Sequence, residues 1–136
     1  MNGQKPLEMI LARNLLSSVS TPAFLVGEEG VLLFYNEAAA AMLGRRFEET
    51  GTMPADQWTA EFGPFDGDDI PMPYDQIPAT RAIRENRPYH GNFRIGGAGG
   101  RHYEIAASAI PIVGPEGASG AIVIFWPVTV QEGETG

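Results

Sequence analysis

The sequence predicts an α+β fold built on one antiparallel sheet and preceded by an amphipathic helix. Two observations lead to this prediction. Segments with strand character come as a pair near the N-terminus and as a run of three at the C-terminus, and segments with helical character lie between them. Short glycine-bearing turns join the strands within each group, which favours antiparallel pairing over repeated βαβ units.

The first predicted element is the amphipathic helix. Leu7, Ile10, Leu11 and Leu15 recur at three- and four-residue spacing, so they fall on one face of a helix. A helix of about three turns is marginal in water and needs a packing partner. This apolar stripe packs either on the protein's own core or on the same stripe of a second chain. We predict a homodimer with these four residues in its interface.

Residues 23–26 and 31–35 are predicted to form the first two strands, because the glycines between them suit a tight hairpin. An alanine-rich helix follows directly. Asn36 precedes this helix as a good N-cap, and Gly44 supplies a left-handed stop at its end. Since Asn and Asp cap about equally well, replacement of Asn36 by Asp is expected to be nearly neutral.

The segment 45–73 is the least regular part of the chain and contains Pro and Gly throughout. One or two helical turns are expected over residues 54–61 and a short strand over residues 62–65. The next helix is expected to begin with Asp75 as its N-cap and to end at Asn86.

The last third of the chain is predicted to be all strand, because alternating segments follow one another with glycine-rich turns between them. The three strands are expected at residues 89–95, 101–113 and 119–130. The chain then divides into an N-terminal helix with its connector (1–20), one domain (21–130) and a frayed acidic tail (131–136).

Composition limits the classes of function. The chain of 136 residues is 43% hydrophobic, which suits a single globular domain. Seventeen acidic residues against nine basic ones give a formal net charge of -8. An acidic surface repels phosphate backbones and anionic lipid, so we expect neither nucleic acid nor membrane partners. The chain has no Cys and no apolar N-terminal segment, and we predict a cytoplasmic location.

The sequence contains no convincing catalytic or metal motif. Gly96–Gly100 lacks the Lys-Ser/Thr of a phosphate loop, so a hairpin turn is the better interpretation. Asp66–Asp69 lacks the ligand spacing of a calcium loop and is interpreted as an acidic turn. His90 and His102 have no carboxylate at ligand spacing, so no metal site is predicted. Without a nucleophile motif near Ser108 or elsewhere, we predict no catalytic residue and no enzyme.

Aromatic and apolar residues surround the irregular segment and the predicted C-terminal strands. They form either plain core or an apolar pocket between the sheet and the central helices. Irregular chain over a concave sheet seldom packs without room to spare, so we predict a cavity that takes a small apolar ligand. Its predicted walls are Trp58, Tyr74, Ile77, Phe93, Tyr103 and Ile105.

Several short motifs occur in a characteristic order. They are Tyr35-Asn36, Ala38–Gly44, Asp66-Gly67 with Ile70-Pro71, Pro78–Arg84 with Pro88, Ser108–Ile112, Gly117, Gly120 and Phe125–Thr129. This ordered set resembles the PAS domain family over about residues 8–130. The resemblance implies a five-stranded antiparallel sheet with helices on one face, and a sensory or protein-interaction role.

The resemblance also bears on cofactors and signal output. The flavin-photoreceptor branch of the family needs a reactive Cys, and the haem branch commonly uses a His on the helix matching residues 75–86. The sequence has neither, so neither haem nor flavin is expected, and any ligand is an unidentified small molecule. Pro127-Val128-Thr129 stands where many members carry an acidic residue in the triplet that couples the sheet to an output helix.

Three hypotheses of function follow. The first is a ligand-responsive sensor that signals through its dimer or through a partner protein. The second is a ligand-free module for homodimerisation or protein interaction. The third, a small α+β enzyme, has no supporting set of residues.

Overall fold

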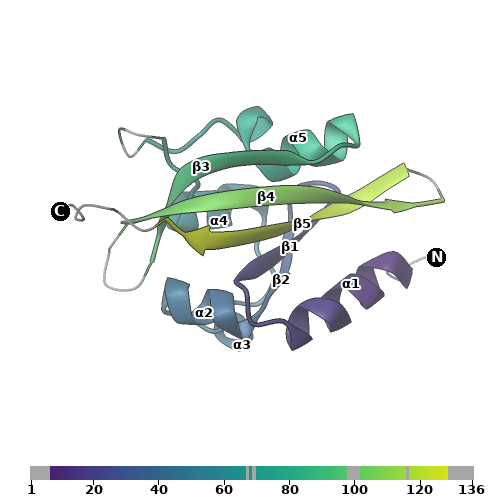
Figure 1. The fold of residues 1–136 in the computed structure, drawn as a ribbon, viewed down its shortest axis with the longest axis horizontal. Coiled ribbons are helices and arrows are strands. Elements are labelled where there is room, and N and C mark those ends of the chain that lie inside the picture. Colours follow the sequence, from purple (N-terminus) through teal and green to yellow (C-terminus); the bar gives the residue numbers. More distant parts are fainter. Residues whose placement is uncertain (1–6, 67, 69, 98–101, 116, 129–136) are drawn as a thin grey trace.

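The computed structural model of the chain describes residues 7–66, 68, 70–97, 102–115 and 117–128. Its centre is an antiparallel sheet of five strands in the order β2-β1-β5-β4-β3 (Figure 1). The strands are β1 (Ala23–Gly27), β2 (Leu32–Tyr35), β3 (Tyr89–Gly96), β4 (His102–Gly114) and β5 (Gly117–Pro127). The predicted five-stranded antiparallel sheet is confirmed.

The helices precede the sheet or lie between β2 and β3 in the chain. They are α1 (Leu7–Ser18), α2 (Glu37–Leu43), α3 (Phe47–Thr50), α4 (Ala55–Phe62) and α5 (Pro78–Glu85), with a 3-10 turn, η1 (Tyr74–Gln76), ahead of α5. Figure 1 shows α5 along β3 and α1 on the far side of the strands.

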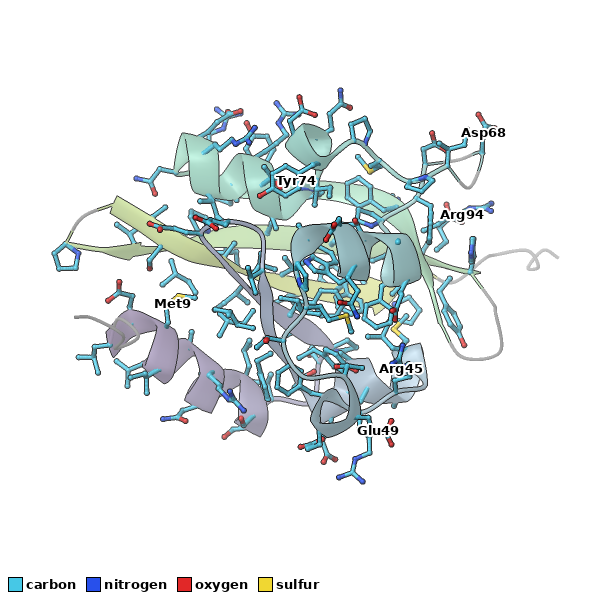
Figure 2. All side chains as sticks on the ribbon, turned by 180° about the vertical axis from the view of Figure 1, so that it is seen from behind. Met9, Arg45, Glu49, Asp68, Tyr74 and Arg94 are labelled. Atoms are coloured by element: carbon cyan, nitrogen blue, oxygen red, sulfur yellow. The ribbon has the colours of Figure 1, made fainter. Side chains whose placement is uncertain are left out.

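Alternation along the strands creates two apolar layers, one on each face of the sheet. Phe24 and Phe125 belong to the layer that α2, α4 and α5 cover, which we call the inner face. Leu25 belongs to the other layer, on the outer face, where Met9 and Leu16 of α1 pack. Figure 2 shows Met9 between α1 and the strands. The helices α2, α4 and α5 therefore lie on one face, as predicted, and α1 covers part of the other face. Helix α3 lies beside β2, where its Phe47 contacts both layers.

The junction between β2 and α2 follows the sequence-based prediction. The Asn36 side chain accepts a hydrogen bond from the Ala39 backbone N–H at 3.0 Å and caps α2. Gly44 ends α2 with a φ of 82°, in the left-handed region that costs glycine little. Both caps act on backbone groups within a few residues, so they could be predicted from the sequence.

The predicted start of α5 at Asp75 is wrong. Asp75 lies in the 3-10 turn η1, and α5 begins at Pro78 with Ile77 as the N-cap residue. Proline has no backbone N–H and is favoured at the first helical position, where that donor has no partner anyway. Asn86 ends α5 in the left-handed conformation, as expected.

The irregular segment is more helical than the sequence indicated. The turns expected over residues 54–61 form α4, and α3 was not expected at all. The short strand expected over residues 62–65 is wrong, because Phe62 ends α4. Only Phe65 of that segment makes strand-like bridges, to Pro71 and to Arg94 of β3.

Some expectations fall wholly or partly outside the described residues. They concern the acidic tail 131–136, the start of the N-terminal segment 1–20, the glycine turn 96–100, the acidic turn 66–69 and the last residues of the strand predicted over 119–130.

Candidate functional site

An apolar cavity of about 40 Å³ lies between the inner face of the sheet and the helices α4 and α5. Four of the six residues predicted as its walls line it, namely Trp58, Ile77, Phe93 and Ile105. Phe24 and Phe125 line it as well. These two walls were not predicted from the sequence, although alternation in their strands places both on the inner face.

The two tyrosines predicted as walls lie elsewhere. Tyr74 in η1 is about a third exposed and packs against Gly30 in the turn between β1 and β2. Tyr103 in β4 packs against Gly97 at the end of β3, outside the cavity lining. Each hydroxyl therefore stays away from the apolar space, as the cost of burying an unpaired polar group requires.

Trp58 connects the cavity to the β1–β2 turn. It is buried in α4, and its indole Nε1–H donates a 2.7 Å hydrogen bond to the Gly30 carbonyl oxygen. The ring lies across the Phe24 ring, with centroids 6.1 Å apart and the planes almost perpendicular. Because its N–H is bonded to the turn, Trp58 offers the cavity an apolar surface only.

The size and lining of the cavity restrict what it can hold. Apolar side chains and proline surround it, so water would find no hydrogen-bond partner there. For comparison, an engineered cavity that binds benzene measures about 150 Å³. The cavity as it stands suits a ligand of a few apolar atoms, and a larger one requires movement of α4 or α5.

The histidines lie away from the cavity. His90 in β3 and Ser108 in β4 sit opposite each other on the outer face, with His90 Nδ1 2.7 Å from Ser108 Oγ. His102 stacks on Phe65 with ring centroids 4.7 Å apart. Among the described residues, no three His, Cys, Asp or Glu side chains gather as a metal site would require.

Helix α1 presents a buried stripe and an exposed stripe. Met9, Ala12 and Leu16 pack on the outer face of the sheet. The four residues predicted for a dimer interface, Leu7, Ile10, Leu11 and Leu15, are 67%, 45%, 57% and 58% exposed. We call these four residues the α1 stripe.

The sheet beside α1 also exposes apolar side chains. Ile110 of β4 and Trp126 of β5 are 40% and 45% exposed, and alternation places both on the outer face. Ile122 of β5, the register partner of Ile110, packs against the α1 layer. The α1 stripe and the uncovered part of the outer face are thus neighbouring apolar surfaces.

Two charged side chains next to the α1 stripe are engaged within the chain. The Glu8 carboxylate accepts a hydrogen bond of 3.1 Å from the Ser119 hydroxyl on β5. The Arg13 guanidinium lies 4.5 Å from the centroid of the Phe34 ring. Contacts within the chain therefore hold both charged side chains in place before any partner binds beside the α1 stripe.

The strand order and the position of the helices between β2 and β3 define an α+β fold with one antiparallel sheet. A family model described as the PAS fold matches residues 16–133. The chain therefore belongs to the PAS-fold family.

Solved structures of the same fold are similar over almost the whole chain. The PAS domain of a Colwellia psychrerythraea protein has a TM-score of 0.64 at 18% identity, covering 88% of this chain and 98% of that one. The PAS domain of Bordetella pertussis BvgS has a TM-score of 0.63 at 15% identity, covering 94% and 91%. A PAS domain from a two-component sensor histidine kinase has a TM-score of 0.59 at 19% identity, covering 92% and 100%. No curated protein sequence matches the chain.

The third of these PAS domains comes from a protein described as a two-component sensor histidine kinase, and PAS domains are generally sensory. None of the described helices has the length and apolar composition needed to cross a bilayer.

Proposed function

We propose that this chain is a signalling PAS domain that works as a homodimer, with the α1 stripe and the neighbouring outer face of the sheet in the interface. The observation that carries the proposal is the exposure of four large apolar side chains along one side of a single helix. Apolar patches of this kind mark interaction surfaces on soluble proteins.

Burial of the α1 stripe alone contributes too little free energy for a stable dimer. Burying the exposed half of a Leu or Ile side chain contributes about 1 kcal/mol, so four on each of two chains contribute roughly 8 kcal/mol. Association costs about 4–15 kcal/mol in lost translational and rotational freedom. The stripe by itself is therefore marginal, and we include Ile110 and Trp126 in the proposed interface because they add exposed apolar surface beside it.

Size-exclusion chromatography with light scattering tests the dimer. Wild type is expected to elute as a dimer at tens of micromolar, and Ile10→Glu and Leu11→Glu are expected to be monomeric, because each buries an unpaired carboxylate. Ile70→Glu is the matched control, since Ile70 is 56% exposed and lies between α4 and α5 in the chain. A monomeric wild type would refute the proposal, as would stripe variants that remain dimeric.

A second candidate function is the sensing of a small apolar ligand, which the cavity favours. Ile77, Pro78 and Ala79 at the start of α5 line the cavity, so a ligand that enlarges it would displace this helix. Xenon is a suitable probe, because it enters dry apolar cavities. It is expected to shift the amide resonances of Ile105 and Ala107 in wild type and not in Ala107→Val, where the added methyl groups occupy the space.

If xenon leaves those resonances unchanged in wild type, the ligand-free dimerisation module is the better description. A signalling partner protein, a cytoplasmic location and the lack of catalytic activity remain predictions of the same proposal.

A further inference from the structure

A second hollow lies outside the cavity, between the β1–β2 turn and α5. It measures about 320 Å³ and is lined by Glu28, Glu29, Tyr74, Thr80, Ile83 and Arg84. We call it the flank pocket. Figure 2 shows Tyr74 beside α5, at one side of this region. The volume is within the range of small-molecule sites, which begins at about 300 Å³.

The flank pocket contains a buried polar group without a partner. Thr80, in the first turn of α5, is 5% exposed, and its hydroxyl has no hydrogen bond to any other residue that the structure describes. Buried hydroxyl groups in folded proteins are nearly always hydrogen-bonded, so an exception calls for an explanation. A polar ligand in the pocket would supply the missing partner.

The charged side chains that line the flank pocket also lack an ion-pair partner among the described residues. Within the described part of the chain, Arg84, Glu28 and Glu29 form no ion pair, although all three line the same hollow. The lining of the pocket therefore includes a guanidinium and two carboxylates that no ion pair joins.

We propose that the flank pocket binds a small zwitterion, namely a free α-amino acid with an apolar side chain. The Arg84 guanidinium suits the ligand carboxylate, since it donates in the planar geometry that carboxylates accept. The Glu28 and Glu29 carboxylates suit the ligand ammonium group, and the Thr80 hydroxyl donates to the ligand carboxylate. Ile83 and the Tyr74 ring provide the apolar surface for the ligand side chain.

The charges exclude other ligand classes. A divalent cation would face the Arg84 guanidinium, and a phosphate would face the carboxylates of Glu28 and Glu29. A ligand that carries both signs of charge finds an opposite charge for each of its groups in the pocket lining. Because these side chains are largely exposed, each ion pair is weak in water, and binding in the millimolar range is expected.

The walls of the flank pocket are held in place before any ligand arrives. The Tyr74 hydroxyl lies so close to Gly30 that a Cβ placed there would be 2.6 Å from it. The Arg84 guanidinium lies 5.5 Å from the centroid of the Tyr74 ring, which reduces its rotamer freedom. Both walls are thus connected through Tyr74, and a site ordered in advance loses less entropy on binding.

The flank pocket shares α5 with the inner cavity, and its β1–β2 turn is hydrogen-bonded to a wall of that cavity. Ile77 to Ala79 line the cavity, and the next residue, Thr80, lines the flank pocket. Trp58, a wall of the cavity, is bonded to Gly30 in the same turn. A ligand that draws α5 toward the turn would therefore change the shape of the cavity. The proposal is nevertheless independent of dimerisation and of any cavity ligand.

L-leucine is the probe for this proposal, with two matched analogues that keep its apolar group. One is 3-methylbutylamine, which lacks the carboxylate, and the other is 4-methylpentanoate, which lacks the ammonium group. In an NMR titration of the full chain, leucine is expected to shift the amide resonances of Glu28 to Gly30 and of Thr80 to Arg84. Each analogue is expected to bind at least about tenfold more weakly, because it leaves one end of the pocket unpaired.

Two variants separate a ligand site from a structural role. Arg84→Gln is expected to lose most leucine binding, and Thr80→Val is expected to weaken it severalfold without lowering the melting temperature, because the hydroxyl it removes has no partner in the fold. The proposal is overturned if leucine shifts none of these resonances, or if the analogues bind as well as leucine. It is also overturned if Arg84→Gln binds leucine normally, or if the shifts are confined to cavity residues such as Ile105 and absent from the residues of the flank pocket.

Discussion

Asn36 makes more hydrogen bonds than a helix cap needs, and its replacement is the sharpest test of the fold. Its Oδ1 accepts from the backbone N–H groups of Ala39 at 3.0 Å and Ala23 at 3.1 Å. Its Nδ2 donates to the carbonyl oxygens of Thr21 at 2.8 Å and Leu16 at 3.2 Å. With 2% exposure, the side chain joins α1, its connector, β1 and α2 at one buried point.

The magnitude follows from the number of groups left unpaired. A cap alone is worth about 1 kcal/mol. Asn36→Ala removes partners from two buried donors, one buried acceptor and one partly buried acceptor. A buried group left unsatisfied costs about 1–3 kcal/mol. Since water and backbone relaxation recover part of this, we expect a loss of about 3 kcal/mol in the free energy of unfolding.

Asn36→Asp is the more discriminating variant. Aspartate keeps the two accepted bonds and loses the donors to Thr21 and Leu16, so a buried carboxylate faces two carbonyl oxygens. We expect a loss of at least about 2 kcal/mol, because repulsion adds to the two unpaired acceptors. The donor bonds thus contradict the sequence-based expectation that this replacement is nearly neutral.

Urea unfolding followed by tryptophan fluorescence measures both variants. Asn92→Asp is the matched control, because Asn92 is exposed on β3, and its free energy of unfolding is expected to change by less than about 0.5 kcal/mol. If Asn36→Asp also stays within that limit, the assignment of Nδ2 as a buried donor is wrong.

Three further changes test other contacts. Tyr35→Phe removes a hydroxyl that donates to the Arg45 carbonyl at 2.7 Å, and we expect a loss of about 1 kcal/mol in urea unfolding at neutral pH. Burial raises the pKa of Tyr35 above its ordinary value of 10.0. The free energy of unfolding of wild type is therefore retained below pH 10 and falls as pH rises through the folded-state pKa. Tyr35→Phe is expected to lack this decrease in stability at high pH. Gly30→Ala is expected to lower the free energy of unfolding by about 2 kcal/mol, and with it the melting temperature. The reason is that Gly30 has a φ of 80° and lies against Tyr74. An unchanged melting temperature would contradict this contact between Gly30 and Tyr74. Trp58→Phe leaves the Gly30 carbonyl without its donor, and calorimetry is expected to show a loss of about 2 kcal/mol in the free energy of unfolding; a loss below about 0.5 kcal/mol would refute this.

The sequence predicted the elements whose signals are local. Asn36 and Gly44 bracket α2 because capping depends on backbone groups within a few residues. Alternation in the C-terminal strands indicated which residues share a face, since side chains of a strand point alternately to its two sides. Four cavity walls followed from that alternation together with the apolar character of α4 and α5.

The predictions that failed depend on competition between segments. Asp75 has the chemistry of a cap, but Pro78 suits the first position of α5 better and the helix starts there. Tyr74 is aromatic, as a cavity wall often is, yet it packs on Gly30, which lies more than forty residues earlier in the chain. No local pattern contains such a contact.

The sequence by itself determined the α+β class, the antiparallel strands and the amphipathic character of α1, because propensity, capping and periodicity act over a few residues. Only the tertiary structure shows which side of α1 is buried. The α1 stripe and the Met9–Leu16 side are both apolar, and packing on β1, β4 and β5 distinguishes them. The tertiary structure also decided that Asn36 joins four segments and that Thr80 meets Arg84 and the β1–β2 turn at one pocket. Such sites are formed by residues distant in the chain, and their geometry exists only when the sheet brings those residues together.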